Sequence, residues 1–207
     1  MYRVSNIVRS VFVACAAMLV ASCNNDADTI LTQQQNGIQT YLKGSHQPKL
    51  IPESELSASL EANPPFYTQW GIDLFRYIST YYDEGRDARD EIVWGSSVDI
   101  VYTAYIFTSG KPNNSAIYAT NDQATLDILK AEGLNTEYEW TTDPYRIVMG
   151  DSEVVEGLET ALIGCREGDK MEIYMTYEMA YGKQYIGMVP SKSAVVWYVD
   201  VVGVGVE

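Results

Sequence analysis

The side chains that most often carry catalysis are scarce in this chain. Histidine occurs once, as His46, and cysteine occurs three times, as Cys15, Cys23 and Cys165, among 207 residues. A triad needs a base beside its nucleophile, and transition-metal sites need several histidine or thiolate ligands. The chain contains no nucleophile elbow, P-loop or Cys-x-x-Cys motif. The sequence therefore disfavours a conventional triad and a transition-metal site, and we expect neither a metal nor a cofactor.

Carboxylates and tyrosines are the plentiful polar side chains. The chain holds 28 Asp and Glu residues against 14 Lys and Arg residues, so its formal net charge is −14. Paired-acid chemistry and calcium binding stay open, although the carboxylate spacing matches no EF-hand loop. Nucleic acid is not expected as a partner, because an acidic chain repels phosphate backbones. The 16 tyrosines and 4 tryptophans suit either strand packing or a binding surface of rings with a polar tip.

The first 22 residues predict a secretory signal peptide. A basic start with two arginines leads into an apolar run over residues 11–20, which is too short to span a bilayer stably. Two small residues, Ala21 and Ser22, then stand directly before Cys23. This ending resembles the bacterial lipobox, which implies a lipid on Cys23 and anchoring in a bacterial cell envelope, facing the periplasm or the surface. Simple secretion with cleavage nearby is the alternative.

Residues 23–65 predict an N-terminal arm made of a helix and a linker. A short helix with one apolar face is expected between Asp28 and Gly44. Four prolines between residues 47 and 65 indicate a linker. The arm would hold the following domain at a distance from the membrane.

The pattern over residues 66–207 is typical of one α+β domain. Short runs rich in Tyr, Ile, Val and Trp alternate with turns, which indicates five or six antiparallel strands. Cys165 follows an apolar segment and is expected to be a small buried hydrophobe rather than a nucleophile. The expected strands cover residues 72–82, 98–107, 145–149, 171–176 and 194–202, and the expected helices cover residues 122–132 and 154–163.

Several short motifs follow one another in the second half of the chain. The motif Val154-Val155-Glu156-Gly157-Leu158 comes after Gly150, and a Glu-Gly-Asp-Lys turn and the motif Ala180-Tyr181-Gly182 follow it. Upstream lie the segments Val101-Tyr102-Thr103 and Pro144-Tyr145-Arg146. This order, over roughly residues 90–207, resembles the FKBP-type peptidyl-prolyl cis–trans isomerases. The resemblance implies an α+β fold in which a curved antiparallel β-sheet wraps around one short α-helix.

The resemblance also implies which residues form a prolyl pocket. Tyr181 would donate its hydroxyl to a substrate carbonyl, Val155 would donate its backbone N–H to another, and Trp197 would help to enclose the prolyl ring. Such a pocket needs no nucleophile, since tighter binding of the twisted amide lowers a rotation barrier of about 18–20 kcal/mol. The substrate-binding walls, floor and rim would be Tyr102, Tyr118, Tyr145, Val154, Leu158, Tyr185, Met188 and Val189.

The chain departs from the family pattern around this pocket. Leu158 replaces the tryptophan of the pocket floor, Ala119 replaces an acid, and the loop from Tyr181 to Pro190 is about one residue shorter. A stretch at about residues 122–136 is inserted beside the expected pocket mouth. Loss of the floor ring would weaken stacking against a proline ring.

Two functions therefore stay open. One is a membrane-anchored prolyl isomerase that assists the folding of exported proteins and binds proline-containing peptides or unfolded exported proteins. The other is a non-catalytic FKBP-fold lipoprotein that recognises an extended peptide or a glycan through its tyrosines. The retained Tyr181, Val155 and Trp197 favour the first function, and Leu158 favours the second.

Overall fold

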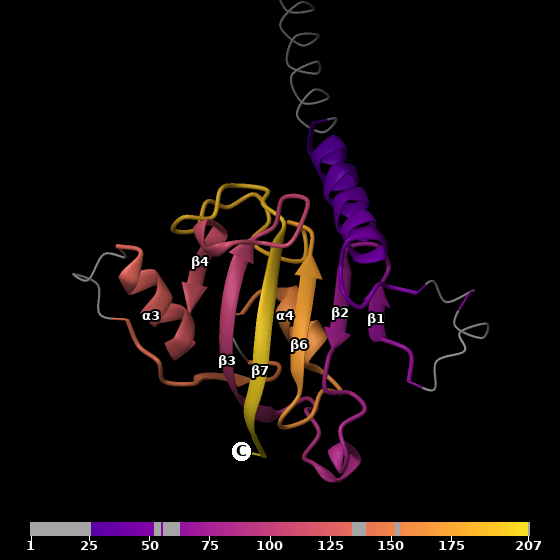
Figure 1. Cartoon of the computed structure of the whole chain (residues 1–207), viewed down its shortest axis with the longest axis vertical. Helices are drawn as coiled ribbons and strands as arrows, with labels where there is room; N and C mark the ends of the chain where they lie inside the picture. The colour runs from indigo at the N-terminus through magenta and orange to yellow at the C-terminus, as the bar shows by residue number, and fades with distance from the viewer. Residues whose placement is uncertain (1–25, 52–54, 56–62, 134–139, 152–153, 207) are drawn as a thin grey trace, which may run out of the picture.

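The computed structural model describes residues 26–51, 55, 63–133, 140–151 and 154–206 (Figure 1). The expected signal peptide, the lipobox with Cys23 and residues 134–136 of the insertion lie outside the described residues. Within the described ranges, no helix is both long and apolar enough to cross a membrane.

One antiparallel sheet organises the domain. Within the described residues it has seven strands in the order β1-β2-β6-β7-β3-β4, and β5 also pairs with β3. Both β4 and β5 pair with the long strand β3, β5 along its first half and β4 along its second half. The strands are β1 (Phe66–Trp70), β2 (Leu74–Ile78), β3 (Ser96–Ile106), β4 (Ile117–Thr120), β5 (Tyr145–Val148), β6 (Lys170–Met175) and β7 (Val195–Val206).

Helices cover both faces of this sheet. Helix α4 (Glu156–Leu162) packs behind the central strands, and α3 (Gln123–Ala131) lies beside β4 (Figure 1). A helix over residues 26–44, here called the N-terminal helix, lies on the opposite face from α4. Two short 3-10 helices, η1 (Arg86–Ala88) and η2 (Asn114–Ala116), complete the described elements. The α+β fold with a sheet around α4 confirms the fold that the sequence predicts.

Alternation along the central strands creates two apolar layers. Ile173 of β6 and Trp197 of β7 are buried in the layer that contains α4. Their chain neighbours Tyr174 and Val196 are buried in the layer beneath the N-terminal helix. Successive side chains of a strand point to opposite faces of a sheet, so the same strands supply both layers.

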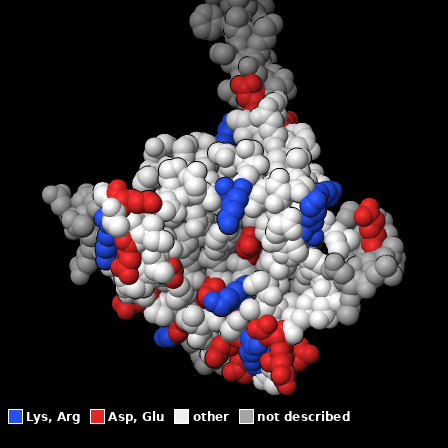
Figure 2. Space-filling model, in the orientation of Figure 1, with Lys and Arg blue, Asp and Glu red and all other residues white. Residues whose placement is uncertain are grey.

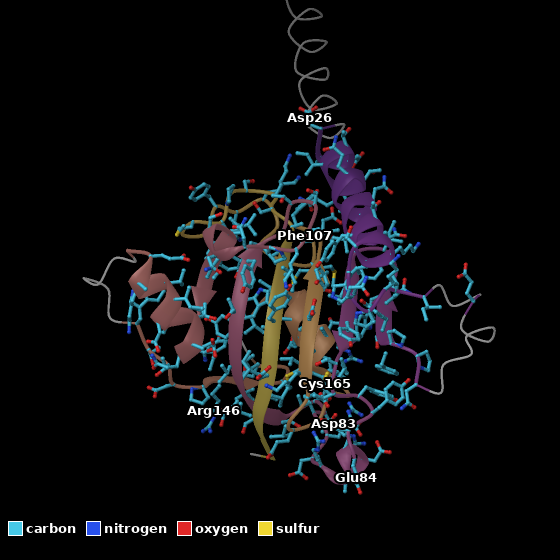
Figure 3. All side chains as sticks on the ribbon, in the orientation of Figure 1. Asp26, Asp83, Glu84, Phe107, Arg146 and Cys165 are labelled. Atoms are coloured by element: carbon cyan, nitrogen blue, oxygen red, sulfur yellow. The ribbon has the colours of Figure 1, made fainter. Side chains whose placement is uncertain are left out.

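The N-terminal helix is part of the packed structure. Ile38 and Leu42 are fully buried, and Leu50, which follows the helix, is 3% exposed. These residues share an apolar cluster with Phe75 of β2 and with Phe107, which directly follows β3 (Figure 3). The helix already includes residue 26, so it is longer at its start than the segment expected from Asp28.

The single histidine is a buried structural residue on this face. His46 is 4% exposed, and its Nε2 lies 2.9 Å from a carboxylate oxygen of Glu172. Its Nδ1 lies 2.6 Å from the Pro48 carbonyl oxygen and 2.6 Å from the Tyr67 hydroxyl. Burial alone would lower the pKa of His46, but the hydrogen bond and the charge of Glu172 raise that pKa above the ordinary histidine value. His46 therefore ties the chain after the N-terminal helix to β1 and β6.

The structure differs from the sequence expectation around residue 71. The pattern predicts a strand over residues 72–82, of which the structure forms β2, and it does not predict β1, which pairs with β2 in a hairpin. Gly71 lies in the turn between these strands with φ of +60°, a conformation that glycine adopts without steric cost. The chain leaves the sheet after Ile78, so the strand is shorter than expected.

The expected helix in the insertion is confirmed as α3. The Asp122 carboxylate caps it by accepting a hydrogen bond from the Thr125 backbone N–H at 2.7 Å. Leu126 is fully buried, whereas Ile128 is 50% exposed. The described part of the insertion therefore packs into its own domain through Leu126.

Candidate functional site

Five ring side chains from five segments gather on the α4 side of the sheet. We call this group the aromatic site: Tyr102 of β3, Tyr118 of β4, Tyr145 of β5, Tyr181 of the loop after β6, and Trp197 of β7. The Tyr102 ring stacks on the Trp197 indole with centroids 4.6 Å apart and planes inclined by 20°. The Tyr145 ring centroid lies 6.1 Å from that of Tyr102. These strands meet because β3 pairs with β4, β5 and β7.

Tyr181 reaches the aromatic site from the loop between β6 and β7. Its hydroxyl donates a hydrogen bond to the Tyr118 hydroxyl at 3.3 Å, and the two rings form a T-shaped pair. Burial raises the pKa of both hydroxyls above the ordinary tyrosine value. Both groups therefore stay protonated near neutral pH and act as hydrogen-bond donors rather than as bases.

The base of the aromatic site holds an unused donor. Trp197 is 6% exposed, and its buried Nε1 forms no hydrogen bond with the described residues. The indole N–H of Trp197 opposes the rise that burial causes in the pKa of the Tyr118 hydroxyl. A buried donor without an acceptor costs about 1–3 kcal/mol.

Helix α4 packs tightly against the start of the Tyr181 loop. The Gly157 backbone N–H donates to the Met179 carbonyl oxygen at 2.8 Å. A Cβ on Gly157 would lie 2.8 Å from that same oxygen, so only glycine allows this approach. Val154 and Val155 precede the helix, and Val155 is its N-cap residue. The Val155 N–H therefore lies before the first helical turn, where backbone N–H groups lack partners within the helix.

The expected floor of the pocket is covered by protein atoms. Leu158 is fully buried and Val189 is 1% exposed. Both belong to the apolar cluster that includes Trp197, with Tyr102 and Tyr181 packed against it. Replacement of the family's floor tryptophan by Leu158 therefore leaves no exposed floor at this position, and Trp197 covers the base of the site.

Two residues expected at the rim stay outside the aromatic site. Tyr185 is 69% exposed and Met188 is 66% exposed, both in the loop between Tyr181 and Pro190. The structure packs neither residue into the apolar cluster. Tyr145, 40% exposed, is the aromatic-site residue most open to solvent.

The hydrogen bond between Tyr181 and Tyr118 was not expected from the sequence. The resemblance matches Tyr118 with a phenylalanine of the family, so the extra hydroxyl was the available signal. The two residues are 63 positions apart in the chain, and only the fold brings their hydroxyls together.

Cys165 does not contribute to this site. It is fully buried after α4, with Sγ 3.1 Å from Arg76 Nη1 and 3.3 Å from the Ala161 carbonyl oxygen (Figure 3). Burial raises the pKa of its thiol to about 11, so it is not a thiolate at neutral pH. This confirms the expected buried hydrophobe. Among the described residues, no three His, Cys, Asp or Glu side chains lie together in a way that could hold a metal.

Charged groups lie apart from one another over much of the visible face (Figure 2). Acidic side chains gather near η1, where Asp83 and Glu84 lie (Figures 2 and 3). The aromatic site is built from neutral rings, so its chemistry is apolar contact and hydrogen bonding.

The fold and the aromatic site define an α+β domain with a ring-lined surface supplied with neutral hydrogen-bond donors. A family model described as FKBP-type peptidyl-prolyl cis-trans isomerase matches residues 91–202, more than half of the chain, and the chain belongs to this family. All five residues of the aromatic site lie within the matched segment. The N-terminal helix, β1 and β2 lie outside it.

Individual relatives are distant. A stretch of 63 residues is 25% identical to FK506-binding protein 1A of Neurospora crassa. That match covers 30% of this chain and 52% of the relative, so the chain spans about half the length of this curated relative. The crystal structure of the three FKBP domains of wheat FKBP73 is 16% identical with a TM-score of 0.48, covering 69% of this chain and 52% of that chain.

Proposed function

We propose that the protein is a prolyl cis–trans isomerase, anchored by a lipid on Cys23 in a bacterial cell envelope, that assists the folding of exported proteins. Proline-containing peptides and unfolded exported chains would be its substrates. The observation that carries the activity is the protonated, half-buried Tyr181 hydroxyl at the aromatic site. The lipobox-like ending at Cys23 supports the anchor.

The proposed reaction needs only rotation about an X-Pro amide bond. Its barrier of about 18–20 kcal/mol arises from amide resonance, which is lost in the twisted state. Tyr102 and Trp197 would contact the prolyl ring, while the Tyr181 hydroxyl and the Val155 N–H would donate to substrate carbonyls. Fixed donors on a water-poor surface stabilise the twisted amide more than the planar one, and this difference lowers the barrier.

Tyr181→Phe is expected to lower kcat/KM for a short X-Pro peptide about fivefold, because one hydrogen bond of about 1 kcal/mol is removed from the twisted state. Magnetisation-exchange NMR of the peptide, with and without protein, measures this rate. Tyr82→Phe removes a hydroxyl that bonds the Pro64 carbonyl oxygen outside the aromatic site and serves as the control. No acceleration by the unmodified protein at high concentration would refute the proposed activity.

A non-catalytic peptide-binding module is the second candidate function. Two observations favour it: Tyr181 already donates to Tyr118, and Trp197 and Leu158 leave no exposed floor. In that case, NMR of a proline-containing peptide mixed with the protein shows shifted peptide resonances, which report binding. The cis–trans exchange rate of the peptide keeps its uncatalysed value.

Cys23→Ser is expected to release the protein from the membrane fraction of a bacterial host, because the acyl chains that would hold it there are lost. Detergent-phase partitioning and intact-mass measurement of the mature protein test this. Cys15→Ser, inside the expected signal peptide, is the matched control and should keep the added lipid mass. An unchanged mass and partition for Cys23→Ser would contradict lipidation.

A further inference from the structure

Gln34 of the N-terminal helix lies between the two ends of the loop that carries Tyr181. This loop, residues 176–194, connects β6 to β7. The Gln34 side chain donates from Nε2 to the Lys192 carbonyl oxygen at 2.7 Å. Its Oε1 accepts the Tyr177 backbone N–H at 2.9 Å. One amide group therefore binds the first and the last turns of the loop at the same time.

The bonds inside the loop connect these two ends to Tyr181. The Gly182 N–H donates to the Tyr177 carbonyl oxygen at 2.8 Å, and the Lys192 N–H donates to the Gly182 carbonyl oxygen at 3.0 Å. Gly182 directly follows Tyr181. A shift at either end of the loop would therefore move the residue beside the Tyr181 ring.

The backbone of Lys192 has a strained conformation that hydrogen bonds from other residues stabilise. Its φ of +58° lies in the left-handed region, which is unfavourable for a residue with a side chain. Gly182 accepts the hydrogen bond from its N–H, and Gln34 donates one to its C=O. Gln34 thus stabilises the strained residue at which the loop returns to β7.

The Gln34 amide is not what docks the N-terminal helix. The helix is held by the apolar contacts of Ile38 and Leu42 and by a separate bond from Gln35 Nε2 to Asp73 Oδ1 at 2.9 Å. Gln33, one residue earlier, is exposed. The side chain of Gln34 can therefore be changed while the helix keeps its packing.

We infer that Gln34 is a positioning residue, which holds the β6–β7 loop so that the Tyr181 hydroxyl stays at the aromatic site. This inference rests on the proposed function for its catalytic consequence, because Tyr181 would be the donor to the substrate. The N-terminal helix, which lies outside the matched family segment, would then help to position a residue of the aromatic site.

The test compares Gln34→Leu, Gln34→Glu and the control Gln33→Leu in the full chain. For Gln34→Leu, amide hydrogen exchange at Tyr177 and Lys192 is expected to become about tenfold faster, with β7 amides unchanged. Gln34→Glu keeps the Oε1 acceptor, so protection of the Tyr177 amide is expected to persist. The kcat for an X-Pro peptide is expected to fall about tenfold in Gln34→Leu with a smaller change in KM, because donor placement is lost rather than ring contact.

The two arms separate failure of the inference from failure of the proposed function. Loop exchange in Gln34→Leu equal to that in Gln33→Leu would overturn the inference, whatever the activity. Faster loop exchange with unchanged kcat in an active protein would also overturn it. An inactive unmodified protein would refute the isomerase function, while hydrogen exchange would still decide whether Gln34 orders the loop.

Discussion

Trp197→Ala is expected to abolish acceleration of X-Pro isomerisation and to lower the free energy of unfolding by about 3–5 kcal/mol. The indole is 6% exposed and stacks on Tyr102, so its removal leaves a cavity at the base of the aromatic site. The same change removes the ring surface that would contact proline. Chemical denaturation measures the stability, and magnetisation-exchange NMR of a peptide measures the activity.

Two further variants keep this prediction open to refutation. Trp94 is 64% exposed, so Trp94→Ala should change stability by less than about 1 kcal/mol. Trp197→Phe keeps a ring but removes the Nε1 donor that has no partner among the described residues, so it should lose far less stability than Trp197→Ala. Activity in Trp197→Ala equal to that of the unmodified protein would show that the aromatic site is not where proline binds.

Asp169→Ala is expected to lower the free energy of unfolding by about 3–5 kcal/mol, because it leaves the buried Arg86 charge without its partner. Asp169 is fully buried and accepts from Arg86 Nε at 2.8 Å and from Nη2 at 2.6 Å. It also accepts the Arg166 backbone N–H at 2.8 Å. The pair connects η1, outside the matched family segment, to the turn before β6. Urea denaturation gives the loss.

A second Arg–Asp ion pair, with the same two-bond geometry but greater exposure to solvent, serves as the control. Arg146 binds Asp99 through Nε at 2.8 Å and Nη2 at 2.7 Å, but the Arg146 side chain is 66% exposed and the Asp99 side chain 27% exposed. Water screens such a pair, so Asp99→Ala should cost about 0–1 kcal/mol. Equal losses for the two substitutions would show that burial does not set the contribution of Asp169.

Local sequence pattern was sufficient for the long central strands. The runs expected at residues 98–107 and 194–202 correspond to β3 and β7, whose alternate residues are buried in the layer that contains α4. The β1–β2 hairpin was not predicted, since the expected strand over residues 72–82 includes β2 but begins after β1. Strands with weak alternation of apolar and polar residues could therefore be recognised only in the structure.

The candidate site was only partly visible in the sequence. Motif order pointed to the five residues of the aromatic site, and the fold brings their rings together. The same resemblance pointed to Tyr185 and Met188, which are exposed on the loop, and their part in substrate binding stays a prediction. Gln34 carried no sequence signal, because its partners lie 143 and 158 positions away.

The sequence by itself determined the family, the α+β class and the absence of the usual catalytic motifs, because these depend on residue types and their spacing along the chain. The tertiary structure alone decided that Trp197 covers the base of the site, that Tyr181 donates to Tyr118, and that Gln34 joins the two ends of the Tyr181 loop. These features depend on which side chains face each other across strands and helices from distant parts of the chain. Residue spacing along one segment does not specify such contacts, because each segment takes its final side-chain directions from the partners it packs against.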